Sequence, residues 1–359
     1  MFSGTRLRQA RELGSLTQTK LGKLIKRSQG TVANLEAGLL SPSQDLLAEI
    51  ASVTQFPIAF FSQDPPIEIP SLMFRARAAM SRTEEAAGRR SAELVLEVVT
   101  QVLERYVAPI PINLPSGSSP VVAAQQMRRV MGLSPEEPIT YLIHSIEKAG
   151  VTVLALPTNL RKVDAFSAWA GEARERPIIA LCPGRPGDRL RWNVSHEVGH
   201  LILHRHSQYV RAHEHRQADQ FAAELLLPEI AIREQFGPVV TLSTIAALKP
   251  RWGVAMQALI RRALDLNVIS EHQYRHLFEQ IGARGWRTRE PANLDVPLER
   301  PSALRRMAEI AFGKPINLIR FAAEAQLSVE MIKQIIDGYQ ETAIPPATER
   351  PGKVIQLKG

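Results

Sequence analysis

The stretch SHEVGHLILHRH, residues 195–206, constrains the fold more than any other part of the chain. Its His196 and His200 are four residues apart, so on an α-helix their imidazoles project from one face, about one turn apart. Two ligands of a tetrahedral Zn²⁺ ion need this spacing. Glu197 follows the first histidine and can take a proton from a water at the ion. We therefore predict a helix whose metal ligands are His196 and His200, with Glu197 as the catalytic base and zinc as the cofactor.

Histidines are concentrated in this region, since six of the chain's nine lie within one twenty-residue window. His204 continues the row one turn past His200, but three successive positions on a straight helix cannot converge on one ion. His206 lies ten residues after His196, a spacing that needs a turn at a glycine, and Leu203 stands there instead. We expect His204 and His206 to lie in solvent or around the site, without contact to the ion.

A second helix, spanning residues 213–228, offers a better third ligand. Its expected buried stripe contains Ala218 and Phe221, and His215 shares that stripe because it lies three residues before Ala218. Glu214 falls on the adjacent edge of the helix. We predict that His215 completes a three-histidine site, with Glu214 as the alternative ligand. A site that no longer holds a metal is the remaining alternative.

Residues 1–61 show the pattern of short helices joined by tight turns, and we predict a domain of five helices. Thr17 and Ser28 stand where N-caps belong, on either side of the turn sequence KRS. The helix after Ser28 presents polar side chains to base edges in a major groove, and the residue after Thr17 can meet a phosphate. The apolar residues expected inside are Leu16, Leu21, Leu24, Ile25, Val32 and Leu35. The candidate DNA-contacting residues are Gln18, Ser28, Gln29, Thr31 and Asn34.

Turn-forming residues and changes in hydrophobic periodicity divide the rest of the chain into segments. We expect a Pro-rich linker over residues 62–71, one long amphipathic helix between residue 72 and about 115, and three short strands followed by helices to about 284. The expected strands cover residues 150–157, 165–171 and 177–183. A helical pair over residues 302–338, read as a small packing bundle, precedes a loose C-terminus. The predicted fold class is mostly α with a small β-sheet, and the predicted domains are 1–61, 62–120, 121–284 and 285–359.

Charge and composition restrict the partners. The net charge of +8 favours an acidic partner, with nucleic acid the first candidate. No apolar run is long enough to span a membrane, and the amino-terminal residues lack the apolar core of a secretory signal. Cys182 is the single cysteine, which excludes an internal disulfide and agrees with a reducing compartment. We therefore expect a cytoplasmic protein without a membrane partner.

Two resemblances follow from these motifs. Residues 5–61, including LEAG, PS and the closing AFF, resemble the Xre-type helix-turn-helix domain. The sequences RLRWNVSHEVGHLILH and RQADQFAAELLLP resemble the ImmA/IrrE family of zinc-dependent peptidases, which often follow such a domain in one chain. With AFSAWAG, RPIIAL and GWRTREP, the likeness runs over roughly residues 1–291. That family usually has a glutamate as third ligand, where this chain has His215.

The resemblance implies a function in two parts. The first hypothesis is a zinc-dependent, site-specific metalloprotease and transcription regulator, which cleaves a partner repressor in response to stress such as DNA damage or to a mobile element. The alternative is a DNA-binding regulator whose peptidase-like domain is a sensor without catalysis. The amino-terminal module has seven Lys and Arg residues against four Asp and Glu residues, a modest excess for tight DNA binding by one copy. We therefore expect a homodimer as the DNA-binding form.

Overall fold

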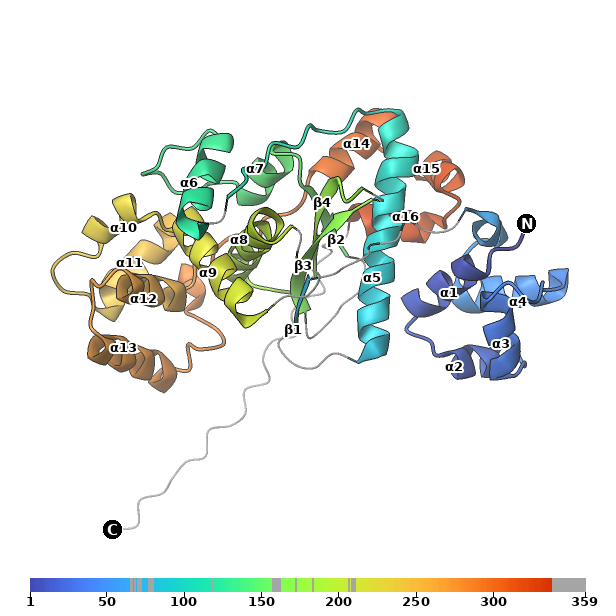
Figure 1. The fold of residues 1–359 in the computed structure, drawn as a ribbon, viewed down its shortest axis with the longest axis horizontal. Helices are drawn as coiled ribbons and strands as arrows, with labels where there is room; N and C mark the ends of the chain where they lie inside the picture. Colours follow the sequence, from blue (N-terminus) through green and yellow to red (C-terminus); the bar gives the residue numbers. More distant parts are fainter. Residues whose placement is uncertain are drawn as a thin grey trace, which may run out of the picture.

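The chain folds into helices around one small sheet, as a computed structural model shows (Figure 1). This confirms the fold class predicted from the sequence, mostly α with a small β-sheet. The residues that the structure describes are 1–64, 67, 69, 73–76, 81–117, 119–156, 163–171, 173–182, 184–205, 207 and 211–337. No helix in these ranges is both long and apolar enough to cross a membrane.

The amino-terminal domain has four α-helices and a closing turn of 3-10 helix. Its elements are α1 (Gly4–Leu13), α2 (Gln18–Leu24), α3 (Gln29–Glu36), α4 (Gln44–Thr54) and η1 (Ile58–Ser62). The N-caps predicted at Thr17 and Ser28 are confirmed, because each hydroxyl accepts a hydrogen bond from the backbone N–H three residues later. The fifth helix expected from the sequence is the short 3-10 turn. Leu24 was wrongly placed inside, since it is 51 % exposed.

Within the described residues, the sheet has four strands in the order β1-β3-β4-β2. They are β1 (Met73–Ala76), β2 (Thr152–Ala155), β3 (Val163–Ala170) and β4 (Arg176–Leu181). The β1–β3 and β3–β4 pairs are antiparallel, whereas β2 and β4 run parallel. The three strands predicted between residues 150 and 183 are therefore confirmed as β2, β3 and β4.

The long amphipathic helix expected between residue 72 and about 115 is present, but a strand that was not expected precedes it. Residues Met73–Ala76 form β1, and α5 (Arg82–Glu97) begins only after Ser81, which caps it in a reciprocal pair with Glu84. A π-helical turn and a 3-10 turn extend the helix to Arg105. The strand was missed because its pairing with β3 is a contact between distant parts of the sequence, which local periodicity does not report.

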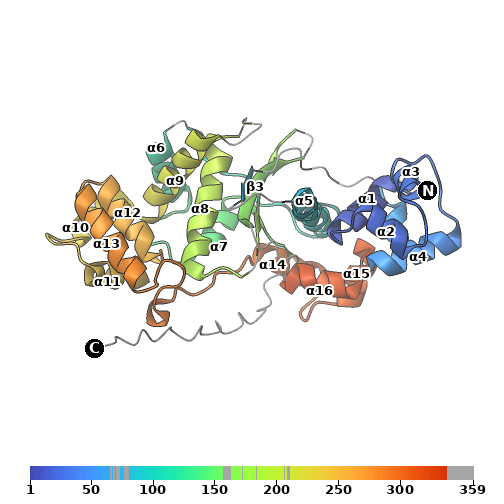
Figure 2. The ribbon, with the colours of Figure 1, turned by 90° about the horizontal axis from the view of Figure 1, so that it is seen from below.

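The two faces of the sheet carry different helices (Figure 2). Helix α8 (Gly187–Leu203) covers one face, where Trp169 of β3 donates its indole N–H to the carbonyl of Leu201 at 3.0 Å. On the other face, Phe166 of β3 belongs to the core that contains α5 and the amino-terminal domain. The alternation of side chains along β3 thus divides the molecule into two cores, one around the HEVGH helix and one around α5.

The remaining helices surround these layers. They are α6 (Pro120–Val130), α7 (Leu142–Lys148), α9 (Ala212–Leu226), α10 (Glu229–Gln235), α11 (Leu242–Trp252), α12 (Met256–Asp265), α13 (Glu271–Ala283), α14 (Ala303–Phe312), α15 (Leu318–Ala325) and α16 (Val329–Asp337). The expected carboxy-terminal helical pair is therefore three helices, because Gly313 and the left-handed Gln326 each end one. These three pack into the core of α5.

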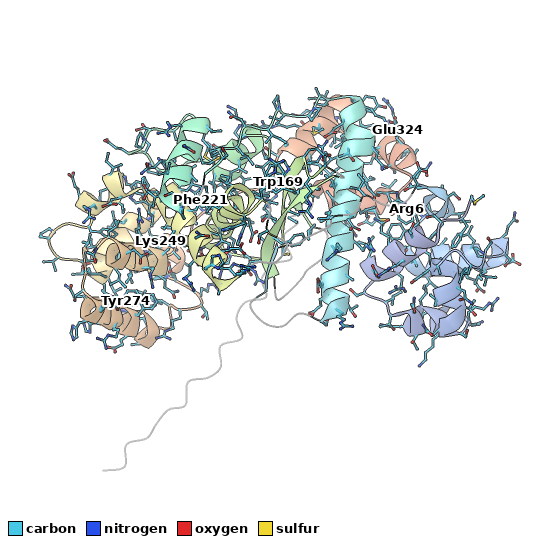
Figure 3. The ribbon with its side chains drawn as sticks, viewed as in Figure 1. Arg6, Trp169, Phe221, Lys249, Tyr274 and Glu324 are labelled. Atoms are coloured by element: carbon cyan, nitrogen blue, oxygen red, sulfur yellow. The ribbon has the colours of Figure 1, made fainter. Side chains whose placement is uncertain are left out.

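The amino-terminal domain is packed directly onto α5. Arg6 of α1 is fully buried and pairs with Glu97 of α5 at 2.6 Å, while its Nε donates to the carbonyl of Asp64 at 2.7 Å. Figure 3 labels Arg6 at this junction. A second pair joins Arg90 of α5 to Glu12 of α1 at 2.8 Å. A buried charge that loses its partner is costly, so these pairs hold the domain in one orientation on α5.

Buried charges also fix the start of α8. Lys249 of α11 is 1 % exposed and forms ion pairs with Asp188, in the first turn of α8, and with Glu290. Figure 3 labels Lys249 in this part of the molecule, beyond α8 from the sheet. The Glu290 carboxylate also accepts the backbone N–H of Met256 at 2.9 Å. The segment after α13 is thereby tied to the helix that carries HEVGH.

Candidate metal centre and DNA-contacting face

Helix α8 places the residues of the HEVGH motif inside the protein. His196, Glu197 and His200 are at most 1 % exposed. The two imidazoles project from the same side of the helix, with ring centroids 4.7 Å apart. This is the arrangement that the four-residue spacing predicted.

Helix α9 brings His215 against these two residues, and Gly199 makes the approach possible. A Cβ atom at position 199 would stand 3.1 Å from the Cα of Ala218 and 3.1 Å from the Cδ1 of Phe221. Glycine within a helix costs about 1 kcal/mol relative to alanine, so it needs a packing reason. The close contact between α8 and α9 supplies that reason, and Figure 3 labels Phe221 in this part of the molecule.

Three imidazole nitrogens form a nearly equilateral triangle. The Nε2 atoms of His196 and His200 are 3.1 Å apart, and each lies 3.3 Å from the Nδ1 of His215. Ligands 2.0–2.1 Å from a tetrahedral zinc ion stand about 3.3–3.4 Å from one another. The three histidines therefore fit one face of a zinc tetrahedron, which leaves its fourth position to a water or substrate. They are the group of side chains in the described part of the chain that can hold a metal.

Asp219 fixes the proton on one of these rings. Its carboxylate lies 2.7 Å from the Nδ1 of His196. An ionised carboxylate only accepts hydrogen bonds, so Nδ1 carries the proton and Nε2 presents its lone pair to the centre of the triangle. A lone pair aimed at two other ring nitrogens is unfavourable without a cation and favourable with one. The donor set therefore suits a metal ion.

Ser167 of β3 holds the glutamate of the motif. Its hydroxyl donates to the Oε2 of Glu197 at 2.6 Å, in a contact buried between the sheet and α8. The neighbouring hydrogen bond from Trp169 to Leu201 holds β3 against the same helix. The Glu197 carboxylate is thus oriented from the sheet side, as a proton acceptor needs to be.

Glu214, the alternative third ligand, is occupied at the start of α9. Its Oε2 accepts the backbone N–H of Arg211 at 2.6 Å and its Oε1 accepts the hydroxyl of Ser207 at 2.8 Å. Burial alone would raise the pKa of this carboxyl, but the two hydrogen bonds hold the pKa below its ordinary value. The geometry brings His215 to the other two histidines and leaves Glu214 at the helix cap. His206, considered above as a ligand, lies outside the described residues.

Three polar residues of this region were not singled out from the sequence: Ser167, Gln217 and Asp219. The last of these lies four residues after His215, so the helical spacing that selected His215 could also have selected it. Ser167 gave a weaker signal, as a small polar residue inside an apolar strand. The carbonyl oxygen of Gln217 lies 3.0 Å from the Nε2 of His204, and the Nδ1 of His204 lies 2.9 Å from the Nδ1 of His200.

Cys182 is buried, which raises the pKa of its thiol to about 12 and excludes it as a nucleophile at neutral pH.

The five residues predicted to contact DNA lie at the amino ends of α2 and α3 and along α3. Gln18 donates to Glu36 at 2.8 Å and accepts from Gln29 at 2.7 Å. The Ser28 hydroxyl caps α3 and lies 2.9 Å from the hydroxyl of Thr31. Asn34, one turn further along α3, is exposed.

A cavity of about 470 Å³ opens beside these residues. Gln18 and Gln29 line it from the amino-terminal domain, and Arg82 and Thr83 line it from the first turn of α5. The face predicted to meet DNA is therefore continuous with the helix that supports the sheet.

Comparisons with known proteins agree with both parts of the molecule. Residues 7–61 match a family model for the helix-turn-helix, and residues 146–264 match the peptidase M78 model, described as the IrrE N-terminal-like domain. A search of curated proteins finds no match to the chain. The two family matches support a DNA-binding regulator that carries a domain of the ImmA/IrrE type.

Proposed function

We propose that this chain, which joins a helix-turn-helix domain to an IrrE N-terminal-like peptidase domain, is a zinc-dependent metallopeptidase and transcription regulator that cleaves a partner protein. The observation that carries the proposal is the triangle of ring nitrogens from His196, His200 and His215, with sides of 3.1–3.3 Å. Such a triangle, buried beside a carboxylate on the same helix, suits metal-assisted hydrolysis.

The chain's own residues divide the work. His196, His200 and His215 would hold the ion, and Asp219 keeps the lone pair of His196 directed at it. A zinc ion supplies Lewis acidity, which polarises a carbonyl and makes water easier to deprotonate at neutral pH. Glu197 takes the proton of the attacking water and delivers it to the leaving amine of the peptide bond. Ser167 orients Glu197 for both transfers.

The substrate we propose is a repressor, cut in response to a stress or mobile-element signal. This part rests on the resemblance to ImmA/IrrE peptidases and on the helix-turn-helix match. A chain that binds DNA and cleaves a DNA-bound protein meets both partners in the cytoplasm, where we place it. Two copies, each presenting one recognition helix, would bind two half-sites about one DNA turn apart.

A second candidate function is a regulator whose peptidase-like domain binds metal as a sensor and does not cleave. The feature that favours it is His215, an imidazole at the position where ImmA/IrrE peptidases usually have a glutamate. A third neutral ligand leaves the site one charge more positive than a carboxylate ligand would. The metal site of this chain therefore differs in charge from that of the peptidases it resembles.

Comparison of protein amino termini in cells separates the two functions even while the substrate is unidentified. Cells would express the wild-type chain, Glu197→Gln or the matched control Glu229→Gln, whose half-exposed carboxylate is on α10. The proposal expects new internal amino termini with the wild type and with Glu229→Gln, and their loss with Glu197→Gln. If the wild type and both variants retain zinc and give identical amino termini, the peptidase function would be refuted and the sensor function would remain.

A further inference from the structure

Beyond the three histidines, a buried hydrogen-bonded chain runs outward from the metal centre. It starts at the Nδ1 of His200, passes through both ring nitrogens of His204 at 2.9 and 3.0 Å, and ends at the side-chain carbonyl oxygen of Gln217. His204 is 7 % exposed and ends α8 as its C-cap. It is therefore close to His200 without standing on the face that points to the centre.

The chain has a direction in this structure, because Gln217 presents its side-chain oxygen, and not its NH2 group, to the Nε2 of His204. A carbonyl oxygen only accepts, so the Nε2 of His204 carries a proton and donates it to Gln217. The neutral ring then has a lone pair on Nδ1, which accepts a hydrogen bond from the Nδ1 of His200. The proton of His200 is thereby held on its outer nitrogen, and its Nε2 presents a lone pair to the triangle.

The reverse direction would disable the site. If His204 donated from Nδ1, the proton of His200 would move to Nε2, the atom 3.1 Å from the Nε2 of His196. A protonated nitrogen cannot bind a metal ion. Asp219 keeps the proton of His196 on Nδ1. His200 needs a comparable acceptor, and Gln217 is the acceptor at the end of the hydrogen bonds through His204.

We propose that Gln217, acting through His204, is a positioning residue that keeps His200 in the form that binds zinc. The inference rests on the proposed metal site and extends it to two residues that do not touch the ion. Helix α9 would then supply one ligand, His215, and the acceptors that orient the two ligands of α8, Asp219 and Gln217. Partners of this kind typically change metal affinity by about 10–100-fold.

The test is a zinc titration of the full chain against a competing chelator, with Gln217→Met as the variant. Methionine has a similar length and no carbonyl acceptor. Gln220→Met is the matched control, since Gln220 is an exposed residue on the same helix. We expect Gln217→Met to raise the Kd for zinc about 10–100-fold and Gln220→Met to leave it unchanged. The thermal unfolding of the metal-free proteins should be alike.

A double variant separates an orienting role from a structural one. His204→Phe removes the link, so adding Gln217→Met to it should cause no further loss of affinity. Independent, additive losses would overturn the proposal, and so would a Gln217→Met protein that binds zinc as tightly as the wild type. If the wild type itself binds no zinc, the proposed function fails first. That outcome is distinct from normal zinc binding by wild type and Gln217→Met alike.

Discussion

The proposed metal centre and the proposed DNA-contacting face of α3 are built in opposite ways. At the metal centre, His196 and His200 are buried and their positions are fixed by other side chains of the same protein. On the DNA-contacting face, Gln29 and Asn34 are exposed, at the surface where a duplex would lie. A buried polar group needs its partners inside the fold, whereas an exposed recognition residue finds them on its ligand.

The difference decides what each region reveals about its ligand. The distances between the three ring nitrogens indicate the size and coordination of the ion that fits between them, because the protein alone sets those distances. The exposed polar side chains of α3 indicate nucleic acid as the class of partner, but they do not specify a base sequence. Within that surface, Gln18 and Gln29 are held by intramolecular hydrogen bonds that DNA contacts would have to replace or extend.

The largest effect we expect on the DNA-contacting face comes from replacing Gln29 and Asn34 together with Ala. Each good pair of contacts to a base is worth about 1–3 kcal/mol of discrimination, so sequence preference should relax. The salt dependence should change little, because neither side chain carries charge. Selection of duplexes from a random pool, followed by titrations at several salt concentrations, measures both. A preference identical to that of the wild type would exclude these two residues as base contacts.

Lys20 provides the opposite test on the same face. It is exposed close to Gln18, so Lys20→Ala should weaken binding to all sequences and lower the slope of log K against log salt by about 0.9 if the side chain meets a phosphate. Arg6 contributes nothing of this kind, since it is buried against Glu97. An unchanged slope in Lys20→Ala would show that Lys20 does not contact a phosphate.

At the metal centre, Gly199→Ala should give an effect opposite to helix propensity. Alanine favours a helix over glycine by about 1 kcal/mol. The added methyl would press on the backbone of Ala218 at 3.1 Å, and overpacking of this kind costs about 1–3 kcal/mol. We expect a lower free energy of unfolding together with weaker zinc binding, as α9 moves away with His215. A more stable protein with unchanged affinity would show that α8 and α9 are not tightly apposed.

The smallest effect should come from Ser28→Ala. Loss of an N-cap costs about 1 kcal/mol of stability, and the hydroxyl of Ser28 is already used by α3. Thermal unfolding should register the loss while sequence preference for DNA stays the same. A change in preference at constant stability would instead restore Ser28 as a base-contacting residue.

Local rules predicted the parts of the molecule that local structure determines. The four-residue spacing of HEVGH, the caps at Thr17 and Ser28, and strands β2 to β4 follow from neighbours along the chain. Helical periodicity also selected His215. Such reasoning gave only a weak signal for Ser167, because its contact with Glu197 joins a strand to a helix thirty residues away.

Charge counted from the sequence was misleading for the same reason. Arg6 and Arg11 were counted in the net charge of the amino-terminal module, but both are buried in ion pairs, with Glu97 and Glu36. Strand β1 was missed because its partner lies about ninety residues away. Each error concerns a residue whose environment is made by a distant segment.

The zinc content of the purified chain tests the central claim most directly. We expect about one zinc ion per wild-type chain, since the three histidines supply the three protein ligands of one tetrahedral site. His215→Ala should lose the metal, and Glu214→Ala, which changes the neighbouring residue at the cap of α9, should keep it. Zinc retained by His215→Ala and lost by Glu214→Ala would transfer the third ligand to the carboxylate. A wild-type chain that binds no zinc would contradict the account.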